Sequence, residues 1–258
     1  MTVSLAFDDT DNVGPLIVLL PGAGDLRSEY RFQIAPLVRA GFRVVTADLP
    51  GHGESPLADE YTVETLATGL IELLESLGPA IVVGTSFAPS AAVWAAAERP
   101  DLVRAVVAIS AHLLDDTSIK AKIFGGVTNV LLRGPWAAPT WAKLYAGWYK
   151  GAKPADLDHE IDSLRAMFAD PKRRRAARET LTADRAGVAE RLAKLNVPTL
   201  TVFGSADDHF PDAAAEGRDI AAKLNGALVV VDGAGHYPHV EQPDTVTAAI
   251  VEFANGVR

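Results

Sequence analysis

The sequence predicts an α/β protein with a mostly parallel central sheet, flanked by helices and interrupted by one helical insertion. Short runs rich in valine, isoleucine and leucine alternate with longer segments of helical periodicity, as in parallel sheets covered by helices on both faces. This alternation breaks once, where about ninety residues separate two successive strands. One crossover helix is too short to fill that interval, so an insertion is expected there.

Each predicted strand is a short apolar run bounded by glycine, proline or polar residues, and each predicted helix carries apolar residues three and four positions apart. An additional strand near 3–8 is expected at an edge of the sheet. The other strands are expected at about 16–20, 43–47, 80–84, 103–109, 198–203 and 227–232. The helices are expected near 29–40, 61–77, 87–98, 184–194, 212–224 and 243–254.

The insertion is assigned to residues 112–183, and the core to residues 1–111 together with 184–258. Four aromatic residues of the insertion fall on one helical face, and we expect this face mainly to pack the insertion against the core. They are Trp141, Tyr145, Trp148 and Tyr149. The alternative is that some rings line an apolar substrate pocket beneath a lid. The residues assigned to that pocket are Trp136, Trp141, Tyr145 and Trp148.

Composition excludes several classes of function. A net charge of −9 argues against a nucleic-acid binder, which normally carries a basic surface. The absence of cysteine excludes disulfides, thiolate metal sites and a cysteine nucleophile. The amino terminus lacks the layout of a secretion signal, and the longest aliphatic run is too short to cross a membrane. We therefore expect a cytoplasmic protein that acts on a small molecule, without nucleic-acid or membrane partners; a homodimer is left open.

A serine stands at a sharp turn between a predicted strand and a predicted helix. Ala80 to Val83 form an apolar run closed by Gly84, and the alanine-rich segment that follows contains Pro89 in its first turn, where no N–H is required. Such a turn exposes the hydroxyl of Ser86 above the sheet, with backbone N–H groups beside it. Ser86 is therefore the predicted nucleophile.

A serine nucleophile requires a base, and histidine has the suitable pKa. His236 directly follows the last predicted strand, between glycines that let the loop bend, and it is the predicted base. His239 is the nearby competitor, for which we favour a supporting role. His52 follows another strand among turn glycines, where we expect it to brace loops. No comparable setting is found for His112, His159 and His209.

The acid of such a site should also follow a strand. Asp207 lies three residues after Gly204 and is the predicted acid. Asp208 is the alternative at this strand, although it could instead cap the next helix. Asp115 and Asp116 are a more remote alternative after the strand that ends at Ser110.

A serine nucleophile also requires an oxyanion hole, in which two N–H donors point at the oxygen that becomes negative. Phe87 directly follows the nucleophile and offers one of them. The loop "PGAG" after the first central strand should offer the other. The best donor there is the N–H of Ala23, because Gly22 allows close approach and Pro21 has no N–H.

Together these motifs resemble the α/β-hydrolase family over almost the whole chain. The motifs, in order, are "PGAG", "DLPGHGES", "GTSFA", "GSADDHF" and "GAGHYPHVEQP". The order Ser86, Asp207, His236 is the order of nucleophile, acid and base in that family. The resemblance also implies a helical cap at the position of the insertion. Two residues depart from the family pattern: Ala88 stands where the family commonly has glycine, and Pro21 stands where it commonly has histidine.

The resemblance implies hydrolysis of an ester or related acyl substrate through an acyl-enzyme, without a metal or organic cofactor. In that mechanism His236 transfers the protons, Asp207 orients His236, and the N–H groups of Ala23 and Phe87 bind the oxyanion. Lyases, cofactor-free oxygenases and haloperoxidase-like enzymes share this fold and triad, so they are alternative functions. A ligand-binding protein with little turnover is a further alternative.

Overall fold

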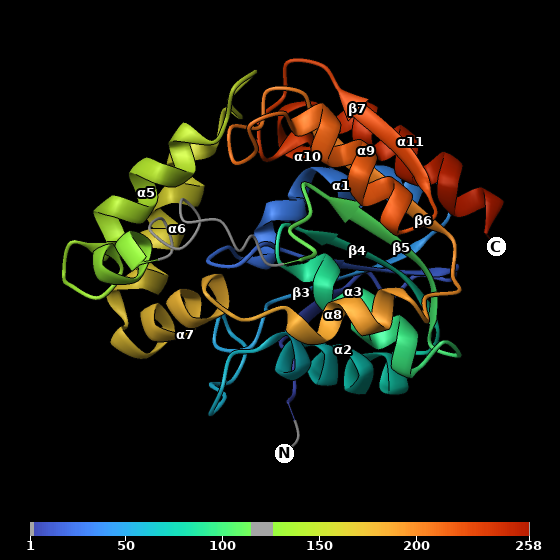
Figure 1. Ribbon diagram of the computed structural model, residues 1–258, viewed down its shortest axis with the longest axis horizontal. Coiled ribbons are helices and arrows are strands. Elements are labelled where there is room, and N and C mark those ends of the chain that lie inside the picture. The colour runs from blue at the N-terminus through green and yellow to red at the C-terminus, as the bar shows by residue number, and fades with distance from the viewer. Residues whose placement is uncertain (1–2, 115–125, 258) are drawn as a thin grey trace.

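The computed structural model describes residues 3–114 and 126–257. Within these residues, seven strands form one sheet in the order β1-β3-β2-β4-β5-β6-β7 (Figure 1). Every neighbouring pair is parallel except β1 and β3, which are antiparallel. The predicted, mostly parallel sheet is therefore confirmed. The strands are β1 (Phe7–Asp9), β2 (Leu16–Leu20), β3 (Arg43–Ala47), β4 (Ala80–Thr85), β5 (Val103–Ile109), β6 (Thr199–Gly204) and β7 (Ala227–Val231).

The helices lie close to their predicted positions, with small differences at the ends. The helix predicted near 29–40 is a 3-10 turn followed by an α-helix, and a short helix after the last strand was not predicted. The core helices are η1 (Arg27–Tyr30), α1 (Arg31–Arg39), α2 (Val63–Leu77), α3 (Ala88–Glu98), α8 (Ala186–Leu192), α9 (Ala213–Lys223), α10 (Pro238–Glu241) and α11 (Pro243–Gly256). The insertion contains α5 (Ala137–Gly147), α6 (Leu157–Ala169) and α7 (Pro171–Leu181).

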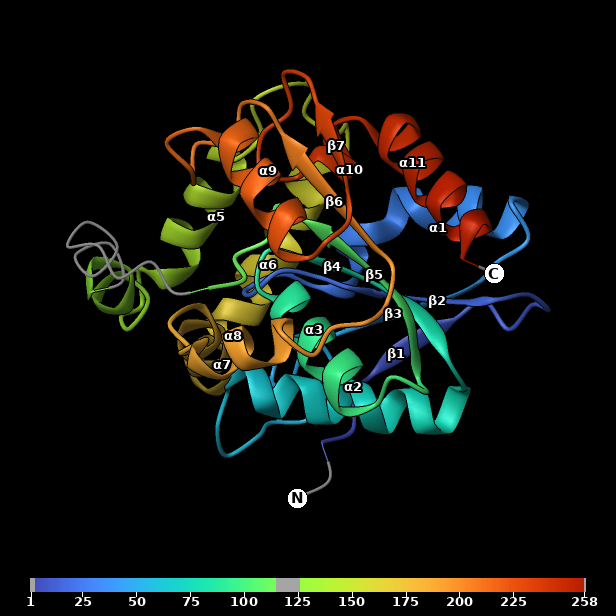
Figure 2. The ribbon, with the colours of Figure 1, turned by 45° about the vertical axis from the view of Figure 1, so that its right-hand side comes forward.

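Helices cover both faces of the sheet (Figures 1 and 2). Strand β2 is buried throughout, and its alternate side chains enter two different cores because successive side chains of a strand point to opposite faces. Val18 and Leu20 pack with α2 and α3, whereas Ile17 and Leu19 pack with α1 and α11. This double burial explains why the central strands are continuous apolar runs rather than alternating ones.

The parallel register brings the carboxyl ends of β4, β5, β6 and β7 to one edge of the sheet. Thr85 pairs with Ile109, Ile109 with Val202, and Gly204 with Val231. The loops that follow these strands therefore lie side by side. In an open parallel sheet this edge is where ligands bind.

Helices α5, α6 and α7, called the cap here, pack against each other and against the core. Their apolar side chains form a third core that includes Tyr237 of the core domain. At its border, Arg31 forms an ion pair with Asp156 at 2.6 Å, and the hydroxyl of Ser28 donates to Glu160 at 2.8 Å. In the described ranges, no helix has both the length and the apolar character needed to cross a bilayer.

Candidate active site

Ser86 occupies the turn between β4 and α3 in a left-handed conformation, with a φ of 58°. This backbone conformation is costly for a residue other than glycine and is often found at functional sites. The turn is held on both sides, because the N–H of Ser86 donates to Ile109 at 2.9 Å and its carbonyl accepts from the N–H of His112 at 2.9 Å. A Cβ on Gly84 would lie 3.0 Å from Ala88, so glycine permits the close approach of strand and helix.

The histidine and the acid expected to accompany Ser86 are hydrogen-bonded to each other. Nδ1 of His236 lies 2.8 Å from Oδ2 of Asp207, and both side chains are buried. Burial raises the pKa of Asp207, but the charges and hydrogen bonds of His236 and His209 bring that pKa well below its usual range. Because an ionised Asp207 can only accept, Nδ1 of His236 carries a proton and Nε2 is available as a base.

Within the described residues, Ser86 is hydrogen-bonded through its backbone, and no bond joins its hydroxyl to His236. His112 contacts both residues. Its N–H binds the carbonyl of Ser86, and its ring centroid is 5.9 Å from that of His236. Catalytic hydrogen bonds are often long in unliganded enzymes and tighten when substrate is bound.

The alternatives to Asp207 and His236 lie in different settings. Asp208 is exposed and forms an ion pair with Lys150 at 2.6 Å. His239 is fully buried, with its Nε2 2.8 Å from Oε1 of Glu29. His52 accepts the N–H of Gly24 through Nε2 at 3.0 Å, which is the loop-bracing contact predicted for it. The remaining alternative acids, Asp115 and Asp116, lie outside the described residues.

Two histidines of this site, His112 and His209, are not predicted from the sequence. His209 binds Oδ1 of Asp207 through its ring Nδ1 at 2.9 Å and through its backbone N–H at 3.1 Å. Its ring centroid lies 3.9 Å from that of His236. Burial and the charge of His236 lower the pKa of His209 and of His112. The only local signal was the position of His209 two residues after the acid.

In the loop after β2, the N–H groups on both sides of Ala23 are hydrogen-bonded. The N–H of Gly22 donates to Glu29 at 2.9 Å, that of Gly24 to His52, and that of Asp25 to the carbonyl of Gly22 at 3.1 Å. In the part of the chain that the structure describes, the N–H of Ala23 has no acceptor.

The N–H of Phe87 likewise has no acceptor among the described residues. A Cβ placed on Gly22 would lie 3.4 Å from Cβ of Ser86, so the loop after β2 and the serine turn are in close contact. The two predicted oxyanion donors are therefore free, and their two segments are neighbours.

The aromatic residues assigned to a pocket have three different environments. Trp141 and Tyr145 are buried in the core between the cap and the α/β domain, as expected for residues that dock the insertion. Trp148 is half-buried, with its ring centroid 4.8 Å from that of His209 and 6.0 Å from that of His236. Trp136 has 52% of its surface exposed. Of the four, Trp148 has ring contacts to the histidines of the site, whereas the exposure of Trp136 gives no support to a pocket role.

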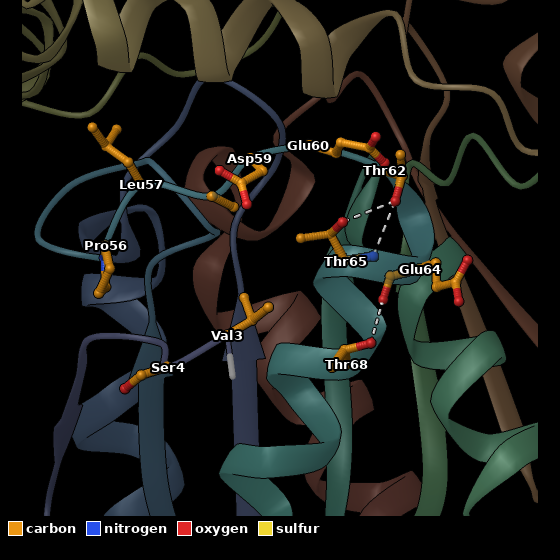
Figure 3. A pocket seen from close by; sticks show the side chains of 11 residues that line it. Val3, Ser4, Pro56, Leu57, Asp59, Glu60, Thr62, Glu64, Thr65 and Thr68 are labelled. Carbon is orange, nitrogen blue, oxygen red and sulfur yellow. Dashed lines mark hydrogen bonds between the residues drawn. The ribbon is translucent and has the colours of Figure 1, made fainter. Parts of the chain in front are cut away.

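Two surface hollows differ in their relation to this site. One of about 620 Å³ lies between the amino-terminal segment, the loop at 56–60 and the start of α2, with Asp59, Glu60 and Glu64 on its walls (Figure 3). It contains none of the predicted site residues. The other, of about 490 Å³, is lined by α5 and Asp208 and is bordered by Trp148, which also contacts His236.

Asp207, His209 and His236 are also the described residues that could together hold a metal ion. Their ligand atoms lie within 4.8 Å of one another. Each imidazole Nδ1 already binds a different oxygen of Asp207, at 2.8 and 2.9 Å. These hydrogen bonds occupy both oxygens of the carboxylate. Hydrogen bonding between one acid and two histidines therefore accounts for the cluster without a metal ion.

The chain resembles known proteins in both sequence and structure. The chain is 28% identical over 258 residues to the pimeloyl-[acyl-carrier protein] methyl ester esterase of Neisseria meningitidis, covering 93% of this chain and 77% of that one. It is 27% identical over 267 residues to the putative non-heme bromoperoxidase BpoC of Mycobacterium tuberculosis, covering 99% of both. A thermophilic esterase from Thermogutta terrifontis superposes with a TM-score of 0.76 at 26% identity, covering 98% of this chain and 93% of that one. The sequence profile of the alpha/beta hydrolase family matches residues 17–249, and the chain therefore belongs to that family.

Proposed function

We propose that this protein is a serine hydrolase that cleaves a small carboxylic ester through an acyl-enzyme. The observation that carries the proposal is the buried hydrogen bond between Asp207 and Nδ1 of His236, at the strand ends beside the strained turn of Ser86. This arrangement supports a mechanism in which His236, with its proton on Nδ1, serves as the base for the hydroxyl of Ser86, which stands on a strand-to-helix turn. Membership of a family whose relatives include esterases supports the same reaction class.

In the first half of the reaction, the hydroxyl oxygen of Ser86 attacks the ester carbonyl while Nε2 of His236 takes its proton. The N–H groups of Ala23 and Phe87 stabilise the negative charge on the former carbonyl oxygen. His236 then gives its proton to the departing alkoxide, which leaves as an alcohol. In the second half, His236 takes a proton from water, the resulting hydroxide attacks the acyl-enzyme, and the proton returns to Ser86 as the acid is released.

The positive charge that His236 carries in both transition states is stabilised by Asp207. The carboxylate is buried at 2.8 Å from the imidazole, where a low local dielectric strengthens the attraction. His209 binds the other carboxylate oxygen at 2.9 Å, which restrains the rotation of Asp207 away from His236. The half-buried ring of Trp148 gives the site an apolar wall beside His236, which favours a substrate with a small apolar group.

Covalent labelling tests this function. A fluorophosphonate probe should label the wild-type protein at Ser86, identified by peptide mass, and short nitrophenyl esters should be turned over. Ser86→Ala should abolish labelling and lower kcat by about 10⁴-fold or more while the fold persists, because only one hydroxyl is deleted. Comparable turnover in both proteins would refute the covalent mechanism. Labelling without turnover on a broad panel of esters, thioesters and lactones would instead favour a ligand-binding role or one of the other reactions found on this fold.

A further inference from the structure

The oxyanion loop after β2 is tied down by two buried side chains from different parts of the chain. Glu29 of η1 accepts the N–H of Gly22 at 2.9 Å, and His52 of the loop after β3 accepts the N–H of Gly24 at 3.0 Å. These two N–H groups lie on either side of the N–H of Ala23, which has no acceptor in the described ranges. The loop is thus anchored immediately before and immediately after its free donor.

Glu29 has the properties of a charged anchor. Its side chain is only 1% exposed, and Nε2 of His239 lies 2.8 Å from Oε1 in an ion-pair contact. Burial raises the pKa of Glu29, but His239, the N–H of Gly22 and the hydroxyl of Thr85 outweigh burial and bring that pKa below its ordinary value.

The neighbouring Asp25 limits the negative charge near the oxyanion. Its carboxyl is 2% exposed and accepts a hydrogen bond from the hydroxyl of Tyr237 at 2.8 Å. Burial and the charge of Glu29 raise the pKa of Asp25 well above its usual value, which disfavours its ionised form. Gly22 lies between Asp25 and Ser86, because a Cβ on Gly22 would be 3.0 Å from Asp25 and 3.4 Å from Ser86. A negative charge on Asp25 would therefore lie close to the reacting serine. The pKa of Asp25 is raised and that of Glu29 is lowered, so Glu29 is the more acidic of the two buried carboxyl groups near the oxyanion.

His52 holds the other side of the loop as a neutral imidazole. Burial lowers its pKa to about 4. Nδ1 lies 3.0 Å from the carbonyl of Pro50, to which it donates, so Nε2 keeps its lone pair for the N–H of Gly24. Gly24 has a φ of 85°, a conformation that glycine adopts readily along with several others. Without the bond to His52, we expect the loop to sample other conformations at this glycine.

We propose that Glu29 and His52 are positioning residues of the oxyanion hole: by binding the N–H groups of Gly22 and Gly24 they aim the N–H of Ala23 at the oxygen that becomes negative. This inference rests on the proposed ester hydrolysis. Donors fixed before the reaction need no reorganisation in the transition state, which is the source of their effect on rate. Releasing either anchor should therefore lower kcat and leave KM nearly unchanged, because the oxyanion exists only in the transition state and intermediates.

The experiment compares Glu29→Ala, Glu29→Gln and His52→Ala with the wild type, using a short nitrophenyl ester and an alkylboronic acid, which forms a tetrahedral adduct with a reactive serine. The two alanine variants should lose about 10- to 100-fold in kcat, less than the loss of a whole donor. Boronate inhibition should weaken by a similar factor, and KM should change by less than about threefold. Glu29→Gln should recover most of the loss, because its amide oxygen can still accept the N–H of Gly22. Glu160→Gln is the matched control, since Glu160 is also a buried acid but binds Ser28 at the border of the cap.

Unchanged kcat and boronate inhibition in folded Glu29→Ala and His52→Ala would overturn the inference. Equal losses in Glu160→Gln would also overturn it, because they would show a general effect of removing a buried charge. If Glu29→Ala does not fold, His52→Ala decides by the same criteria. Fluorophosphonate labelling of the wild type separates the two proposals: absence of labelling at Ser86 overturns the hydrolase function and this inference with it, whereas normal labelling with unchanged kinetics in the variants overturns the inference alone.

Discussion

Replacing Asp207 by asparagine should show whether this carboxylate sets the tautomer of His236. Both oxygens of Asp207 accept N–H groups: Oδ2 from His236 at 2.8 Å, and Oδ1 from the ring and backbone of His209 at 2.9 and 3.1 Å. An asparagine has one accepting oxygen and one donating NH₂ group. Whichever way the amide is turned, its NH₂ group faces an N–H donor, so a simple flip cannot restore the original bonds.

The expected loss in kcat follows from the buried position of this bond. With the amide oxygen turned toward His209, which supplies two donors, the NH₂ group faces His236 and forces the proton of the imidazole onto Nε2. A histidine in that tautomer cannot accept the proton of Ser86. The same change in a serine protease lowers kcat by about 10⁴-fold, and we expect a loss of about 10³- to 10⁴-fold here. That corresponds to about 4 to 5.5 kcal/mol of transition-state stabilisation, at about 1.4 kcal/mol per factor of ten.

The assay is steady-state hydrolysis of a short nitrophenyl ester across a range of pH, with Asp208→Asn as the matched control. Asp208 is exposed and pairs with Lys150 at the surface, so its substitution should change kcat by less than about threefold. A loss of less than tenfold in Asp207→Asn, or a larger loss in Asp208→Asn, would refute this assignment of the acid.

Two further predictions concern stability and substrate range. His52 is fully buried with a pKa of about 4, against 6.5 in the unfolded chain. The unfolded state therefore binds more protons between these pH values, and the free energy of unfolding should fall by on the order of 3 kcal/mol as the pH drops from 6.5 to 4. Urea unfolding at several pH values should show a weaker pH dependence of stability in His52→Gln than in the wild type, and an identical pH dependence in the two proteins would contradict this. Trp141→Ala should lower the free energy of unfolding by about 3–5 kcal/mol and depress activity on all ester chain lengths alike, because the ring is 1% exposed and stacks on Phe168. Trp148→Ala should instead change the preferred chain length of nitrophenyl esters with a smaller effect on unfolding, and the opposite pattern in the two variants would reverse these roles.

Much of the fold was predictable because its signals are local. Runs such as Leu16–Leu20 are buried on both faces, so the strand positions are visible in the apolar composition alone. The serine turn is likewise a local feature, since Gly84 and Ser86 are required where a strand meets a helix within a few residues. The short helix α10 and the 3-10 start of the first helix were not predicted, because such brief elements carry little periodicity.

The sequence by itself determined which residue types follow which strands, and therefore the proposed set of Ser86, Asp207 and His236, because the carboxyl ends of parallel strands meet at one edge. Only the tertiary structure separated Asp207, buried against His236, from Asp208, which is exposed beside Lys150. It alone revealed His209 at Asp207 and the contact of Glu29 with His239, since these pairings depend on how the loops fold over one another. Sequence periodicity describes how one segment faces the core, whereas a buried contact between polar side chains some two hundred residues apart is decided by the packing of the whole chain.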